Sequence, residues 1–140
     1  MNIELMKLVV DYGILVVLLL MGFAAIFFYI ERLLFYKNLD LSMYEKKELL
    51  EIDLTTNTSI VASIASNSVY IGLLGTVLGI LITFYAMGET GQIDVKIIMT
   101  SLAFALKATA LGLVVAIPSM IFYNHLARII EVKISLFEAK

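Results

Sequence analysis

The sequence predicts an all-α integral membrane protein with three transmembrane helices, forming a single membrane domain over residues 1–140. Hydrophobic residues make up 61% of the chain, whereas about half of the residues in a soluble domain are apolar. Mean hydropathy is +1.00. The chain also contains long stretches without any charge, and its single proline suits an almost wholly helical protein. Together these features favour helices embedded in lipid.

Three stretches are long and apolar enough for the roughly 20 residues that a helix needs to cross the hydrocarbon core. They cover about residues 12–30, 69–87 and 97–123. The first stretch holds no charge between Asp11 and Glu31, and the second holds none at all. The third is interrupted by one charge, Lys107. We therefore expect three spans.

Two other interpretations of these stretches are less favourable. A signal peptide has a basic start and a short apolar region, but residues 1–11 hold one lysine against two acids, and the apolar run that follows is longer. Buried core helices of a soluble protein would need more polar surface than a chain of this length supplies.

The distribution of basic residues predicts the orientation. Seven lie in the segment 31–67 and the tail 124–140: Arg32, Lys37, Lys46, Lys47, Arg128, Lys133 and Lys140. Only Lys7 and Lys96 lie on the other side. Because cytoplasmic loops carry the excess of Lys and Arg, we expect a periplasmic N-terminus, with the 31–67 segment and the C-terminus in the cytoplasm.

The connecting segments have distinct patterns. Gly88–Asp94 is short and rich in turn residues, which predicts a tight antiparallel hairpin between the second and third spans. Residues 31–54 mix charges with apolar residues at helical spacing, so we expect the first span to continue as an amphipathic helix. Residues 55–68 are rich in Ser, Thr and Asn and predict a turn or helix start before the second span.

Small residues form a stripe on one face of each of the last two spans. The stripes are Gly72, Thr76, Gly79 and Thr83 on the second, and Ser101, Ala105, Thr109, Gly112 and Ala116 on the third. Small residues let helix backbones approach closely in lipid, so a packing surface is the simpler interpretation. A polar path lined by the threonines is compatible with it.

Two sequence blocks carry a family resemblance. GLLGTVLGI (residues 72–80) and ALKATALGLVVAIPSMIFYN (residues 105–124) resemble the second and third spans of the MotA/TolQ/ExbB proton-channel family, most closely its ExbB-type members. The pair Glu31-Arg32 resembles the family's ER after the first span. Two long motifs in the expected order are far more specific than a lone GxxxG.

The resemblance implies roles for individual residues. Thr76 and Thr109 match the threonines that face the family's channel, Pro118 matches a helix-bending proline, and Tyr123-Asn124 matches the end of the third span. We take Thr76, Thr83, Thr109 and Lys107 as channel-lining candidates. Candidates for helix packing are Gly72, Gly75, Gly79, Ala105, Gly112 and Ala116.

The resemblance also implies partners and a location. Family members form a ring-like homo-oligomer, a pentamer, around a dimer of a single-span ExbD- or TolR-like partner whose membrane aspartate carries the proton. Such complexes sit in lipid in the bacterial inner membrane and drive TonB-like proteins. An ExbB-type transducer is the leading hypothesis. Alternatives are a TolQ-like subunit for envelope integrity and a self-contained small ion channel; a MotA-like subunit fits less well, because those chains have four spans.

Two positions depart from the family pattern. Phe104 occupies a position where many relatives carry glutamate, and Lys107 stands where an apolar residue is usual. None of the three predicted spans contains Asp or Glu. A cation at the depth of Lys107 costs roughly 2.5–3.5 kcal/mol on insertion scales, so we expect it to face the channel or a subunit interface. There it would pair with the partner's aspartate or with another buried acceptor. Snorkelling to the membrane surface is the alternative.

Other chemistry finds little support in the sequence. The absence of cysteine and the single histidine, His125, argue against a metal centre, a cofactor or an enzyme, and the net charge of −2 gives no footprint for nucleic acid. We expect an interfacial structural role for His125. Glu89 and Asp94, in the loop, are expected to be solvated.

Overall fold

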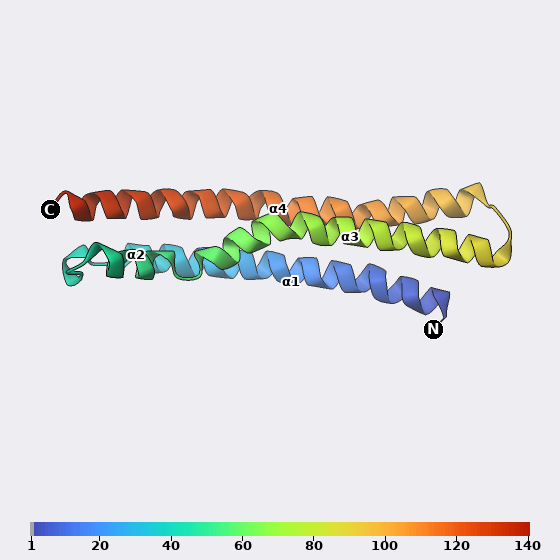
Figure 1. Ribbon diagram of the computed structural model, residues 1–140, viewed down its shortest axis with the longest axis horizontal. Helices are drawn as coiled ribbons and strands as arrows, with labels where there is room; N and C mark the ends of the chain where they lie inside the picture. The colour runs from blue at the N-terminus through green and yellow to red at the C-terminus, as the bar shows by residue number, and fades with distance from the viewer. Residues whose placement is uncertain (1) are drawn as a thin grey trace.

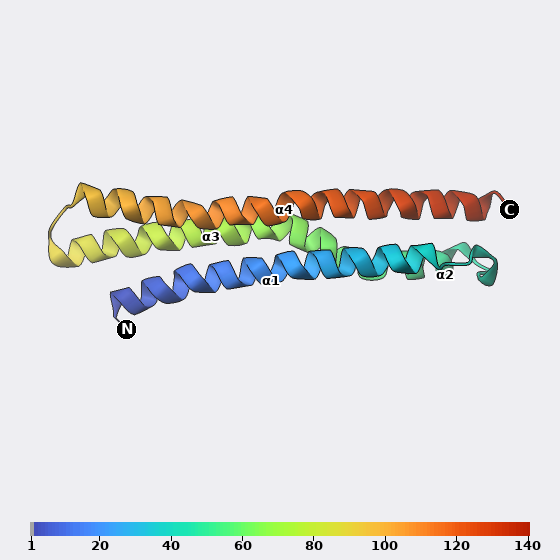
Figure 2. The same cartoon turned by 180° about the vertical axis from the view of Figure 1, so that it is seen from behind.

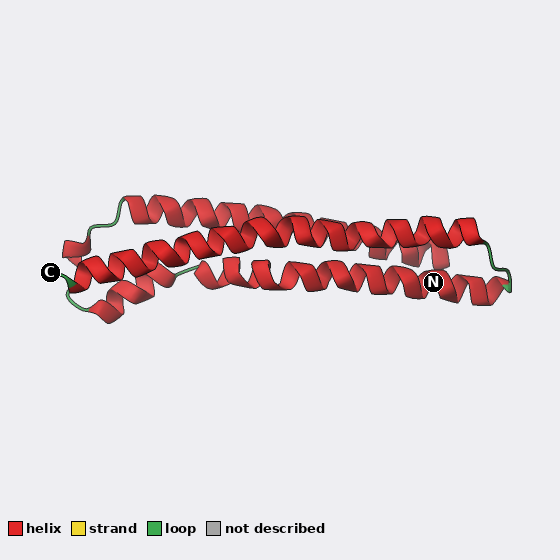
Figure 3. Ribbon diagram, turned by 90° about the horizontal axis from the view of Figure 1, so that it is seen from above, coloured by secondary structure: helices red, strands yellow, loops and turns green. Residues whose placement is uncertain are grey.

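The computed structural model describes residues 2–140, and all regular structure within that range is helical (Figure 3). The elements in chain order are α1 (Ile3–Lys37), a 3-10 turn η1 (Leu41–Met43), α2 (Lys47–Thr55), α3 (Thr58–Thr90) and α4 (Val95–Glu138). The three long helices, of 35, 33 and 44 residues, are long and apolar enough to cross a membrane, as the sequence predicted. They lie lengthwise in one elongated bundle with the C-terminus at one end (Figure 1).

Helices α3 and α4 form the expected antiparallel hairpin. The loop is shorter than predicted, because α3 continues to Thr90 and only four residues separate the helices. Gly91 adopts φ +69 and its N–H donates to the Met87 carbonyl at 2.9 Å, which ends α3 in the left-handed conformation that glycine tolerates best. Asp94 caps α4 by accepting from the Lys96 N–H at 2.9 Å. This exposed carboxylate therefore has a structural role.

Helix α1 runs beside the hairpin, antiparallel to α3 and parallel to α4, and both faces of the bundle show α3 between its neighbours over much of its length (Figures 1 and 2). Leu18 and Ala25 of α1 are buried against Ile64 of α3 and Val115 of α4. The outward faces of the three helices carry exposed large apolar side chains along much of their length. This surface suits contact with lipid.

The prediction of one continuous amphipathic helix over residues 31–54 is wrong. Helix α1 continues the first span only to Lys37, and the chain then reverses through η1 into the separate helix α2. Asp40 drives the reversal, because its carboxylate accepts from the Ser42 N–H at 3.0 Å and the Ser42 hydroxyl at 2.7 Å. Such local side-chain bonds compete with helix formation. The predicted turn before the second span lies at Asn57 (φ +66), after which α3 starts earlier than residue 69.

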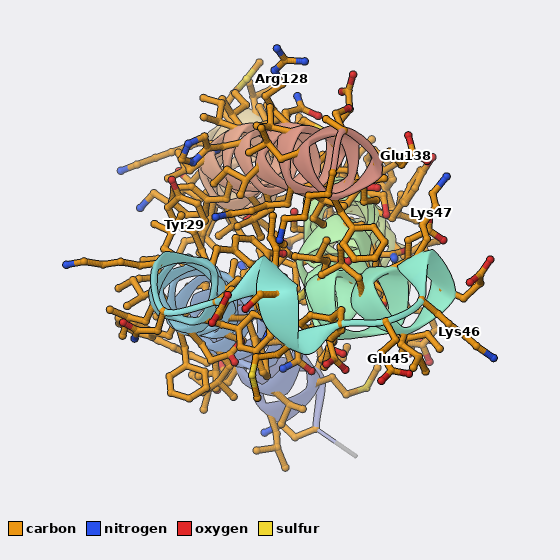
Figure 4. The ribbon with its side chains drawn as sticks, turned by 90° about the vertical axis from the view of Figure 1, so that its left-hand side faces the viewer. Tyr29, Glu45, Lys46, Lys47, Arg128 and Glu138 are labelled. Carbon is orange, nitrogen blue, oxygen red and sulfur yellow. The ribbon has the colours of Figure 1, made fainter. Side chains whose placement is uncertain are left out.

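A second core lies at the C-terminal end of the bundle. We call it the distal cluster, and its buried members are Tyr36, Leu50, Leu54, Val61 and Leu126. Seen end-on in Figure 4, Glu45, Lys46 and Arg128 project outward around this end, and Lys47 pairs with Glu138 at 2.6 Å. The four helices thus meet here, beneath a surface that carries both charged side chains and exposed apolar ones such as Met43 and Ile52.

Arg32 ties α2 to α1. It is 3% exposed and donates to the Asp53 carbonyl at 2.8 Å, while two further donors hold Glu31 at 2.7 and 3.0 Å. The Tyr36 hydroxyl donates to the Leu54 carbonyl at 2.6 Å. These bonds satisfy carbonyls in the last turn of α2 that its own helix leaves free. The hydrogen bond from Arg32 also lowers the pKa of Glu31 from its ordinary value.

Candidate functional site

The small-residue stripes of α3 and α4 meet face to face. A Cβ placed on Gly72 would lie 2.6 Å from the Ala108 carbonyl oxygen, and one on Gly112 would lie 2.7 Å from the Ser68 carbonyl oxygen. Neither distance leaves room for a side chain. The two backbones are therefore in contact at this crossing, which only glycine permits.

Thr76 and Thr109 lie one helical turn from the crossing and hydrogen-bond to each other through their hydroxyl groups. Thr76 also donates to the Ala105 carbonyl at 2.9 Å. A hydroxyl has one proton to donate, so Thr109 donates to Thr76 when Thr76 donates to Ala105. Thr76 is 8% exposed, whereas Thr109 is only partly buried. Thr109 is thus the member of the pair with unused acceptor capacity near the surface.

The other packing candidates extend this interface on both sides. Gly79 lies against Ala105, with 3.0 Å between an added Cβ and the alanine Cβ. Gly75 is enclosed by Ala108 of α4 and Ile14 of α1, at 2.8 and 2.9 Å by the same measure. Ala116 is also buried, at 6% exposure. Every predicted packing residue therefore lies at a helix contact or is buried.

Thr83 is buried at 6% exposure and donates to the Gly79 carbonyl of its own helix at 2.9 Å. It lines a pocket of about 290 Å³ between α1 and the loop end of the hairpin. Lys7, Asp94 and Ser101 line the same pocket, and Lys7 Nζ donates to the Ser101 hydroxyl at 3.3 Å. A mainly apolar pocket with a few polar side chains therefore extends from the loop end of the hairpin to Thr83.

Ser68 was not among the predicted site residues. Its side chain is fully buried beside the glycine crossing, and its hydroxyl has no hydrogen-bond partner among the described residues. A serine in a run of small polar residues gives no signal in sequence that separates it from Ser63 or Ser66, which stay at the periphery. The burial of Ser68 follows from the position of the crossing.

Pro118 lies within α4, which continues without interruption from Val95 to Glu138. Proline has no N–H to donate, so the carbonyl four residues earlier loses its helical partner. The next residue, Ser119, is buried and donates to the Val115 carbonyl at 2.7 Å. The helix-bending role of Pro118 stays a prediction.

Lys107 is separated from the threonines by its position on the helix. It lies two residues before Thr109, about 200° away around the helix axis, where it is exposed and lines a small pocket beside α1. Its Nζ sits 5.2 Å from the ring centroid of Phe104, within range of a cation–π contact. The candidates for channel lining therefore form two groups, the threonines between α3 and α4 and Lys107 near α1.

His125 connects α4 to α1. The Tyr29 hydroxyl and His125 Nδ1 are 2.7 Å apart, and the Tyr29 ring stacks on Phe122 with centroids separated by 4.2 Å. This contact agrees with the structural role expected for His125. Residues 2–140 contain no group of three or more His, Cys, Asp or Glu side chains arranged to hold a metal ion.

These features define a class of protein: a small helical membrane protein built on a backbone-to-backbone hairpin with buried threonines and three helices able to span the bilayer. The model of the MotA/TolQ/ExbB proton channel family matches residues 29–139. The chain belongs to this family, as the two sequence blocks indicated. Its family and its three apolar helices make it a multi-pass protein of the inner membrane.

Similar proteins cover nearly the whole chain. It is 51% identical to the biopolymer transport protein ExbB of Aquifex aeolicus, over 97% of this chain and 92% of that protein. It is 50% identical to the biopolymer transport protein ExbB of Helicobacter pylori, over 91% and 88% respectively. The Tol-Pal system protein TolQ of Haemophilus influenzae is 39% identical over 64% of this chain and 37% of that protein.

Proposed function

We propose that this chain is the ring-forming subunit of an ExbB-type energy transducer, which uses the proton-motive force to power TonB-dependent uptake across the outer membrane. The observation that carries the proposal is sequence identity: about half of the aligned residues are identical to those of two proteins named ExbB, over almost their full length. Copies of the chain form a ring, a pentamer, with the N-terminus in the periplasm and the C-terminus in the cytoplasm. A single-span ExbD-like partner supplies a membrane aspartate, and a TonB-like protein receives the work.

The α3–α4 hairpin lines the proton path in this proposal. Thr76 is committed to the Ala105 carbonyl and to Thr109, so it fixes the position of the second hydroxyl. Thr109 then offers its lone pairs to water in the path. Hydroxyl groups do not titrate near neutral pH, so the threonines orient water while a carboxylate carries the proton. Thr83 extends the polar lining toward the loop end of the hairpin.

A TolQ-like role in envelope integrity is the second candidate, favoured by the similarity to TolQ of Haemophilus influenzae. That similarity covers a smaller share of both chains than the similarity to the ExbB proteins. A self-contained ion channel is the third. These candidates differ in what accompanies the protein in its membrane.

The first test is to extract the protein from its own membranes in mild detergent and to identify by mass what accompanies it. An ExbD-like single-span protein, together with a TonB-like protein, is the expected result. A TolR-like partner with Tol proteins would instead support the TolQ-like role. A homo-oligomer without a partner that still conducts ions after reconstitution would overturn the transducer.

The second test concerns the threonines in the purified complex, reconstituted into liposomes with a pH-sensitive dye inside. Thr109→Ala should abolish most of the proton flux, and Thr109→Ser should retain it, because serine keeps the hydroxyl. Thr100→Ala is the matched control, since the hydroxyl of the exposed Thr100 donates to the Lys96 carbonyl of its own helix, at 2.9 Å, and to nothing else within residues 2–140. Equal flux in Thr109→Ala and Thr100→Ala would show that Thr109 does not line the path.

A further inference from the structure

Asp11 lies deeper in the bundle than its place in the sequence suggests. It precedes the first uncharged stretch, yet Ile14, less than one turn away on α1, packs against Gly75 of α3. Gly75 in turn packs against Ala108 of α4. Gly75 lies about 9 Å inside the uncharged stretch of α3, counted from Val69 at 1.5 Å per residue. Asp11 is therefore level with the interior of the other two apolar stretches.

The surface of α1 supports this depth. The side chains of Leu5, Leu8 and Val9, on the N-terminal side of Asp11, are 49%, 54% and 57% exposed. Apolar surface thus continues almost two turns beyond Asp11 toward the end of the helix. Such a surface is favourable in lipid and unfavourable in water.

Asp11 and Lys107 line the same pocket. Its wall is formed from α1, from Gly75 of α3, and from Phe104, Lys107 and neighbouring residues of α4. The pocket has about 10 Å³ of space for the centre of a water molecule, close to the least that one water requires. The carboxylate and the ammonium group do not approach within the 4.0 Å of a direct ion pair in the described part of the chain. The pocket therefore has room for about one water molecule.

The other charges near this pocket are few. On α1, Lys7 lies one turn before Asp11 and donates to the Ser101 hydroxyl. Helix α3 carries no charged residue from Thr58 to Gly88. On α4, the acids nearest to Lys107 in sequence are Asp94 and Glu131, each several turns away. Asp11 is thus the carboxylate that lines the pocket with Lys107, and Lys7 is the other cation that could act on it.

We propose that Asp11 and Lys107 form a water-bridged charge pair inside the apolar layer, which joins α1 to the α3–α4 hairpin. A lone charge at this depth is costly, and each member reduces the cost of the other. The site stands independently of the ion path, because its test measures the stability of the chain and not transport.

The test is a double-substitution cycle on the full-length protein in lipid nanodiscs, measured as the midpoint of thermal unfolding. Asp11→Asn and Lys107→Met should each lower the midpoint. The double variant should lose less than the sum of the two single losses. Lys7→Met is the matched control, because it removes the other nearby cation, and it should couple more weakly to Asp11→Asn. Strictly additive losses, or stronger coupling to Lys7, would overturn the pair.

Accumulation of the same variants in membranes is a second readout. If a single variant does not accumulate in membranes, accumulation of the neutral double variant supports the pair. A double variant that accumulates no better than the weaker single variant would overturn it.

Discussion

The glycine crossing of α3 and α4 and the distal cluster are held together in opposite ways. At the crossing, Gly72 and Gly112 bring two backbones into contact without large side chains between them. In the distal cluster, Tyr36, Leu54 and Leu126 fill the space between helices with large side chains, as in a soluble protein. One short chain thus contains two kinds of core.

The difference follows from the surroundings of each region. Lipid is as apolar as leucine, so burying a large side chain between helices in lipid gains little, and close backbone contact gains more. Charged side chains project from the surface around the distal cluster, and burial of apolar surface away from water stabilises the cluster by about 25 cal/mol per Å². The change from small residues at the crossing to large buried side chains in the distal cluster is therefore what we expect where a bundle passes from lipid into water.

The largest expected effect comes from a cavity in the distal cluster. Leu126 is fully buried, and Leu126→Ala should lower the free energy of unfolding of this end by about 2–5 kcal/mol. Leu136→Ala on the same helix is the matched control, since Leu136 is 53% exposed. Hydrogen exchange of the α2 amides measures the difference. Equal exchange rates in the two variants would contradict a water-driven core here.

A smaller effect is expected from one added methyl group at the crossing. Gly72→Ala places a Cβ 2.6 Å from the Ala108 carbonyl oxygen, and overpacking of this kind costs about 1–3 kcal/mol. Gly13→Ala is the matched control, because a Cβ there meets nothing within 4 Å. That variant should be neutral or more stable, since alanine favours a helix over glycine by up to about 1 kcal/mol. Thermal unfolding in nanodiscs separates the two, and a loss at Gly13 equal to that at Gly72 would refute the close approach.

The smallest expected effect is a pH dependence confined to the distal end. Arg32 lowers the pKa of Glu31 below its ordinary value of 4.5. A lowered pKa means that the stabilisation is present in full above pH 4.5 and is lost as the pH falls through the lowered value. Exchange of the α2 amides should therefore rise in acid, and Glu31→Gln should remove that component. An unchanged acid response in Glu31→Gln would show that other carboxylates cause it.

The sequence predicted the lipid-embedded part well and the connecting segment poorly. Uncharged stretches identified three helices, and the spacing of Gly72, Thr76 and Gly79 identified the packed face. The prediction for residues 31–54 was wrong, because their apolar residues at helical spacing belong to two separate helices and not to one. The turn between them depends on Asp40 and Ser42, whose short-range bonds a helical pattern does not display.

What the sequence determined by itself was the class of protein: hydropathy sets which segments prefer lipid, and two specific blocks set the family. What only the tertiary structure decided was how the helices are offset along the bundle. Charge counting ends the first span at Asp11, whereas the contact of Ile14 with Gly75 brings that carboxylate to a pocket that Lys107 also lines. The physical reason is that hydropathy is a property of one segment, while the level of a residue in the bundle depends on which side chains of three helices fit together.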